Sequence, residues 1–129
     1  MPAVTTENKV IEVAVTGGRG PAGTNGTSYT PSYLVYTALL NQTFTSAPIA
    51  TVLENTLGSI PPWIYISQGI FRCFLSNRFL NNKTALQIQP GHITVIPVIS
   101  RIDNNYIEVR TNNTNNVLTN NFVEIRIYP

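Results

Sequence analysis

The sequence has few charges, one cysteine and no long apolar run, and each shortage excludes a class of protein. Charged residues make up 11% of the 129 positions and the formal net charge is +2, which is too weak and too scattered for a nucleic-acid interface. Cys73 is the only cysteine, so neither an intrachain disulfide nor a cysteine-built zinc site is expected. No stretch approaches the roughly 18 apolar residues of a membrane-spanning helix, and the first residues lack the apolar segment of a signal peptide.

The residues that usually carry catalysis are also scarce. His92 is the only histidine, and no nucleophile and acid lie near it in sequence to complete a triad. Among the acidic residues, only Glu54 and Asp103 are candidates for the two free carboxylates that a glycoside hydrolase needs. Asp103 also begins a DNN run like that of a calcium loop, but Thr114 stands where the loop needs its closing glutamate. We therefore expect no enzyme, no metal and no cofactor, with a polysaccharide-degrading enzyme as the weaker alternative.

The composition favours β-strands over helices. Isoleucine, valine and threonine together make up 41 of the 129 residues, and such β-branched side chains suit pleated sheets. Turn signals separate short apolar or alternating runs, which predicts an all-β domain, a jelly-roll-like β-sandwich, over residues 29–129. Only residues 33–40 are equally compatible with a short helix. The expected strands are residues 33–40, 49–57, 63–67, 70–75, 84–88, 93–101, 106–110 and 122–128.

Two of these segments repeat an apolar-Glu-apolar-Arg pattern, in YIEVRT and FVEIRIY. One antiparallel register places Glu108 opposite Arg126 and Arg110 opposite Glu124, which predicts that the two strands are neighbours. Their connection, residues 112–121, then forms an exposed polar loop at the tip of the hairpin. The candidate ligand-facing residues of this tip are Asn112, Asn113, Asn115 and Asn116.

Single residues on the expected strands have a plain structural interpretation. Cys73 shares a strand face with Phe71 and Leu75, which predicts a buried small apolar side chain rather than a reactive thiol. The aromatic residues of this part could stack on sugars or bases, but aromatic side chains on strands more often pack in the core or between subunits. These residues are Tyr29, Tyr33, Tyr36, Trp63 and Tyr65.

The N-terminal part has a different organisation. Residues 1–16 end in an alternating apolar run and are expected to form a β-arm. Residues 17–28 then read GGR, GPA, GTN and GTS, so that glycine recurs at every third position. A dinucleotide-binding turn is excluded, because no helix is expected to follow and the next acid is only Glu54. The recurring glycines are Gly17, Gly20, Gly23 and Gly26.

A glycine at every third position is typical of a collagen-like triple helix. Three chains wound together leave room at their common axis only for hydrogen, once in every three residues. The period therefore predicts a homotrimer with a neck formed by residues 17–28. Four triplets are too few to be stable alone, so the flanking parts must hold the trimer together. A flexible glycine-rich linker in a monomer is the alternative.

The order of parts, a β-arm, then GPAGTNGTS, then an all-β head, resembles the fibre, spike and head-decoration proteins of bacteriophage virions. The resemblance covers most of residues 17–129, through IATVLENTLGSIPPWIYISQGIF, NNKTALQI and FVEIRIYP. It implies a trimeric, non-enzymatic structural protein on the virion surface, in which residues 1–16 dock onto the capsid, a fibre base or another virion protein. The short stalk suits a spike, a head fibre or a capsid-decoration protein seated close to the capsid.

Two alternatives to this role remain. The first is the receptor- or glycan-binding head of a tail fibre or spike, which would contact a host-surface glycan through the tip loop and Trp63. The second is a building block of the shell itself.

Overall fold

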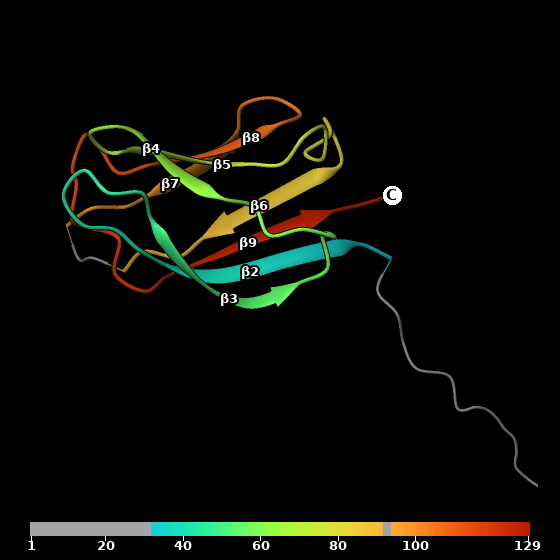
Figure 1. Cartoon of the computed structure of the whole chain (residues 1–129), viewed down its shortest axis with the longest axis horizontal. Coiled ribbons are helices and arrows are strands. Elements are labelled where there is room, and N and C mark those ends of the chain that lie inside the picture. The colour runs from blue at the N-terminus through green and yellow to red at the C-terminus, as the bar shows by residue number, and fades with distance from the viewer. Residues whose placement is uncertain (1–31, 92–93) are drawn as a thin grey trace, which may run out of the picture. The chain divides into compact units, whose positions relative to one another are not determined.

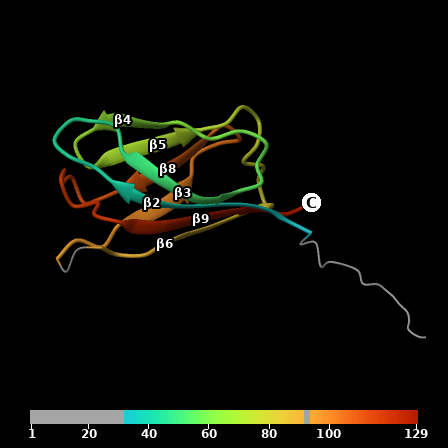
Figure 2. The same cartoon turned by 60° about the horizontal axis from the view of Figure 1, so that its bottom comes forward.

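Two antiparallel sheets make up the part of the chain that the structure describes. The computed structural model describes residues 32–91 and 94–129, and contains strands but no helix there. Figure 1 shows the arrangement, and in Figure 2 strands β4, β5 and β8 form one layer while β2, β9 and β6 form the other. The expected all-β class is confirmed, with two sheets packed as in a β-sandwich. The expected arm, the neck and His92 lie outside the described residues.

Each sheet contains four strands. Sheet I has the order β3-β2-β9-β6 and sheet II the order β4-β5-β8-β7. Sheet I is formed by β2 (Leu34–Asn41), β3 (Ile49–Asn55), β6 (Thr84–Ile88) and β9 (Asn121–Ile127). Sheet II is formed by β4 (Trp63–Ser67), β5 (Ile70–Phe74), β7 (Val98–Arg101) and β8 (Tyr106–Arg110). The first and last of these strands, β2 and β9, pair with each other, whereas β2/β3, β4/β5 and β7/β8 are sequential hairpins.

All eight expected strands correspond to observed strands, and seven agree within two residues at each end. The segment that was compatible with a helix is strand β2, which pairs with β3 on one side and β9 on the other. The strand expected over residues 93–101 begins only at Val98. Pro97 has no backbone N–H to donate to a ladder, which accounts for the late start.

The predicted pairing of the last two strands is wrong. Strand β8 lies in sheet II between β5 and β7, and β9 lies in sheet I between β2 and β6. Glu108 therefore does not face Arg126, but contacts Arg72 and Arg110 within its own sheet. Glu124 contacts Arg126, two residues further along the same strand. Residues 112–121 consequently form a crossover between the sheets rather than the tip of a hairpin.

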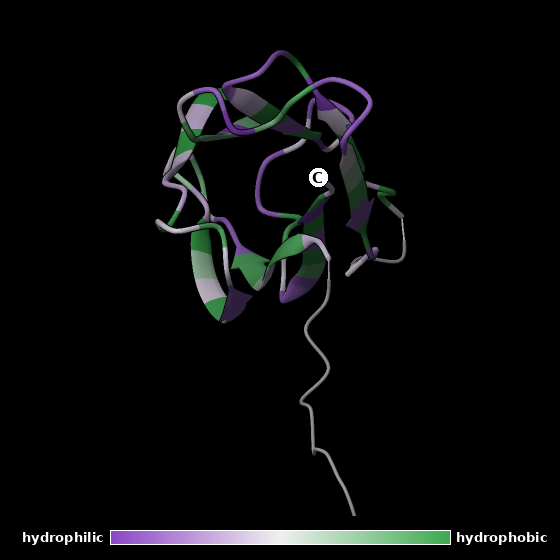
Figure 3. Cartoon of the chain, turned by 90° about the vertical axis from the view of Figure 1, so that its right-hand side faces the viewer, coloured by the Kyte–Doolittle hydropathy of each residue, from purple (hydrophilic) through white to green (hydrophobic). Residues whose placement is uncertain are grey.

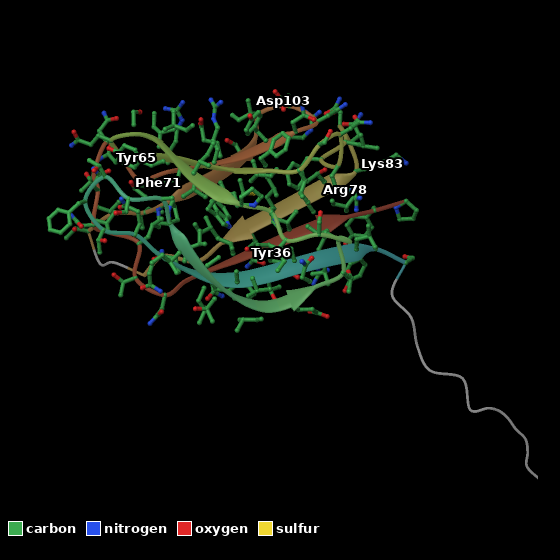
Figure 4. The ribbon with its side chains drawn as sticks, viewed as in Figure 1. Tyr36, Tyr65, Phe71, Arg78, Lys83 and Asp103 are labelled. Atoms are coloured by element: carbon green, nitrogen blue, oxygen red, sulfur yellow. The ribbon has the colours of Figure 1, made fainter. Side chains whose placement is uncertain are left out.

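The core lies between the two sheets and is closed by side chains from both. In β9 and β5 buried residues alternate with partly exposed ones, and Figure 3 shows bands of hydrophobic and hydrophilic residues along the strands. Figure 4 labels Tyr36 and Phe71, which are completely buried, and Asp103 and Lys83, which are exposed. Cys73 is also completely buried, and burial raises the pKa of its thiol to about 12. The prediction of a buried, structural cysteine is confirmed.

Candidate functional site

The four asparagines of the predicted tip fall into two pairs with different roles. The side-chain oxygen of Asn115 accepts the N–H of Gly69 at 2.9 Å, and its nitrogen donates to the hydroxyl of Tyr65 at 3.2 Å. The side-chain oxygen of Asn116 accepts the N–H of Phe44 at 2.6 Å. These bonds fasten the crossover to neighbouring turns. Both polar groups of the Asn115 amide are used within the fold, whereas Asn116 uses its side-chain oxygen.

Asn112 and Asn113 remain exposed on the crossover. Both have positive φ angles, 51° and 55°, a conformation that asparagine tolerates better than most residues. Their backbone oxygens accept hydrogen bonds from Thr114 and Gln68, while their side-chain amides make no hydrogen bond to the described residues. The structure therefore leaves the side-chain amides of Asn112 and Asn113 available to a ligand, and their role as contacts stays a prediction.

Trp63 is not available as a stacking surface. Its side chain is 7% exposed, and its indole N–H donates to the hydroxyl of Tyr36 at 3.2 Å. Burial also raises the pKa of Tyr36. Both rings belong to the core, in agreement with the packing interpretation and against a ligand contact through Trp63.

A different aromatic cluster forms where the residue before β2 meets the residue after β9. The pairing of β2 with β9 brings Tyr33 and Tyr128 together, with ring centroids 5.3 Å apart. The guanidinium of Arg126 lies 4.7 Å from the centre of the Tyr33 ring, and its Nε donates to Glu124 at 2.7 Å. A hydrogen bond with Tyr128 and the ion pair with Glu124 raise the pKa of Arg126. The cluster was missed from sequence because its members come from opposite ends of the described chain.

A shallow hollow borders this cluster on the outer face of sheet I. Its volume is about 210 Å³, and it is lined by Ala85, Leu86, Gln87, Glu124, Arg126 and Tyr128. An aromatic ring beside a carboxylate, a guanidinium and an amide offers both a stacking surface and hydrogen-bond donors and acceptors. Such a combination suits a small polar ligand with an apolar face, for example a sugar ring.

An ion triad lies on the outer face of sheet II. Cross-strand pairing places Arg72 of β5 opposite Glu108 of β8. The carboxylate of Glu108 accepts the Nε–H of Arg72 at 3.0 Å and that of Arg110 at 2.6 Å. Although it points away from the core, the Glu108 side chain is only 1% exposed, because the two arginines cover it. The triad leaves one net positive charge at the centre of this face.

The two carboxylates considered for hydrolysis lie in different parts of the fold, Glu54 in sheet I and Asp103 in the turn between β7 and β8 of sheet II. Asp103 accepts the backbone N–H groups of Asn105 and Tyr106 at 2.7 and 3.0 Å, so its carboxylate closes a turn. Glu54 lies on the edge strand β3 and makes no hydrogen bond to Asp103. Within residues 32–91 and 94–129, no group of three His, Cys, Asp or Glu residues could hold a metal ion.

The described residues also contain no helix that is long and apolar enough to cross a membrane. Comparison of the chain with protein-family models, with curated proteins and with solved structures found no match.

Proposed function

We propose that this chain is a homotrimeric structural protein exposed on the surface of a bacteriophage particle, as a spike, a head fibre or a capsid-decoration protein. The observation that carries the proposal is the glycine at every third position of residues 17–28, followed by an all-β unit. In this proposal residues 17–28 form the neck of the trimer, and residues 1–16 dock onto the capsid or another virion protein.

The surface of the described part supports assembly. Several large apolar side chains on strands and loops are exposed, and burying them between heads would contribute about 25 cal/mol per Å². Such burial supplies the stability that four triplets lack. The exposed apolar residues include Phe44, Ile49, Leu53, Ile60, Ile66, Ile96 and Val98.

The first test is the mass of the full chain in solution. Multi-angle light scattering at micromolar concentration should give three times the chain mass, and a monomer would overturn the proposal. Gly23→Val should lower the melting temperature of the assembly clearly more than Thr24→Val, because only glycine fits at the axis. Equal effects of the two variants would favour the flexible-linker alternative.

The second test concerns the place in the particle. Mass spectrometry of purified virions, with copy numbers counted, should find this chain in multiples of three beside a separate major shell protein. If no separate major shell protein is found and this chain is the most abundant component, it is a shell building block instead.

The hollow beside Tyr128 favours one second candidate function, a glycan-binding head. Because Trp63 is buried, the candidate glycan contact is this hollow instead, with its polar lining and the ring of Tyr128. A glycan array should then show binding that Tyr128→Ala abolishes and that Phe44→Ala, at another exposed ring, leaves intact. Loss of binding in an Asn112→Ala/Asn113→Ala variant would place the contact at the crossover instead, and no binding to host glycans would refute this candidate.

A further inference from the structure

One exposed edge of the sandwich is unusually apolar. Strand β3 pairs only with β2 among the described strands, so its other backbone edge is open. Edge strands are usually protected by lysine, proline or a bulge. A bulge lies opposite Thr37 and Ala38, but β3 contains no lysine or proline. It instead exposes aliphatic side chains, of which Ile49 is 71% exposed.

The same edge contains one carboxylate without a partner. Glu54 is exposed and makes no hydrogen bond or ion pair with the described residues, whereas Glu108, Glu124 and Asp103 all do. It follows Leu53, which is also exposed. We call Ile49, Val52, Leu53 and Glu54 the acidic edge.

The outer face of sheet II has the complementary properties. Arg110 keeps 56% of its side chain exposed although its Nε binds Glu108. Cross-strand pairing places Val98, which is 58% exposed, directly beside it. We call Arg72, Glu108, Arg110 and Val98 the arginine face.

A hollow borders the arginine face and is large enough to accept a side chain of another copy. Its volume is about 500 Å³, and its lining includes Val95, Ile96, Val98, Arg110 and Asn112. It therefore combines an aliphatic floor with a guanidinium and an amide. An aliphatic side chain followed by a carboxylate, the order of Leu53 and Glu54 on β3, matches this lining in both apolarity and charge.

Two different complementary patches on one chain are what a cyclic homotrimer requires. A two-fold dimer uses the same patch on both subunits, whereas a ring is built by head-to-tail contacts between unlike patches. We propose that the acidic edge of one copy docks on the arginine face of the next, with Leu53 in the hollow and Glu54 bound to Arg110. The inference rests on the proposed trimer and names the surfaces by which its heads meet.

Disulfide trapping in the full chain tests the contact directly. A Leu53→Cys/Ile96→Cys variant should form covalent dimers and trimers on mild oxidation, because the two positions would meet between copies. A Leu53→Cys/Lys83→Cys variant is the matched control, since Lys83 is exposed but lies outside both patches. The native Cys73 is buried and should not interfere.

A double-mutant cycle gives an independent measurement by sedimentation. Glu54→Gln and Arg110→Gln should each weaken assembly about tenfold, and the double variant should lose no more than either single variant. Neutral glutamine is used at position 110 because a carboxylate there would face the buried Glu108. If the full chain is trimeric but trapping equals the control and the losses of the two single variants add, the contact is wrong while the proposed function stands. If the full chain is a monomer, both are refuted.

Discussion

The hydrogen bond between Trp63 and Tyr36 gives a sharp test of how the core is held together. Tyr36→Phe keeps the ring but removes the hydroxyl that accepts the indole N–H at 3.2 Å. Tyr36 is completely buried and Trp63 nearly so, so water cannot replace the lost acceptor. A buried donor left without a partner costs about 1–3 kcal/mol. Because the bond is long, we expect a loss of about 1.5 kcal/mol, which lowers the melting temperature of a domain of this size by roughly 6–12 °C.

Urea unfolding measures this loss, followed both by the fluorescence of the single tryptophan and by far-UV circular dichroism. All variants are compared at one protein concentration, because assembly makes the apparent stability concentration-dependent. Tyr65→Phe is the matched control: its hydroxyl also accepts a hydrogen bond, from Asn115 at 3.2 Å, but Tyr65 is half-buried and solvent can compensate. We expect this control to lose less than about 1 kcal/mol. The argument fails if Tyr36→Phe is as stable as the wild type, or more stable than Tyr65→Phe.

Three further outcomes are expected. Burial raises the pKa of Cys73 from 9.0 to about 12 in the folded chain. The neutral thiol therefore contributes fully to the free energy of unfolding below pH 9, and this contribution is lost as the pH rises toward 12. Between pH 9 and 11 the free energy of unfolding of Cys73→Ala should fall less steeply than that of the wild type, by up to about 1.4 kcal/mol per pH unit. Gly69→Ala should cost about 2–4 kcal/mol in denaturant unfolding, because φ is 70° and the added Cβ would lie 2.6 Å from the Thr114 nitrogen. Gly58→Ala, where the nearest atom is 3.7 Å away, should cost about 1 kcal/mol, and equal losses at the two glycines would contradict the steric argument. Glu108→Gln should lose about 1–2 kcal/mol once the exposure of its two arginine partners is discounted, and no change in thermal melting would show that the triad does not stabilise the fold.

Local patterns in the sequence were sufficient for most strands. Alternation and turn residues predicted residues 63–67, 84–88 and 106–110 as strands with the bounds that are observed. Burial of Cys73 followed from its strand face. These features depend on neighbours within a few residues.

Strand pairing was not predictable in the same way. The repeated apolar-Glu-apolar-Arg pattern fits a cross-strand register, but residues two apart on one strand also share a face. Glu108 and Glu124 each use the arginine two positions further along their own strand. The pattern is therefore satisfied within each strand and says nothing about which strands are neighbours.

The candidate site depended on that missing information. Tyr33 and Tyr128 meet only because β2 pairs with β9, and Arg72 reaches Glu108 only because β5 pairs with β8. The two tip asparagines that proved structural are bound to turns far away in sequence. No local signal identifies such partners.

The position of β9 between β2 and β6 has a consequence for biosynthesis. Leu34 finds its partner Ile127 only after the intervening chain has left the ribosome, which takes roughly 5–20 s at typical translation rates. Until then β2 can pair only with β3, and its other edge stays open, which exposes the nascent chain to aggregation. A premature stop before Asn121 would remove the common neighbour of β2 and β6, so truncated products should fail to form sheet I and be degraded.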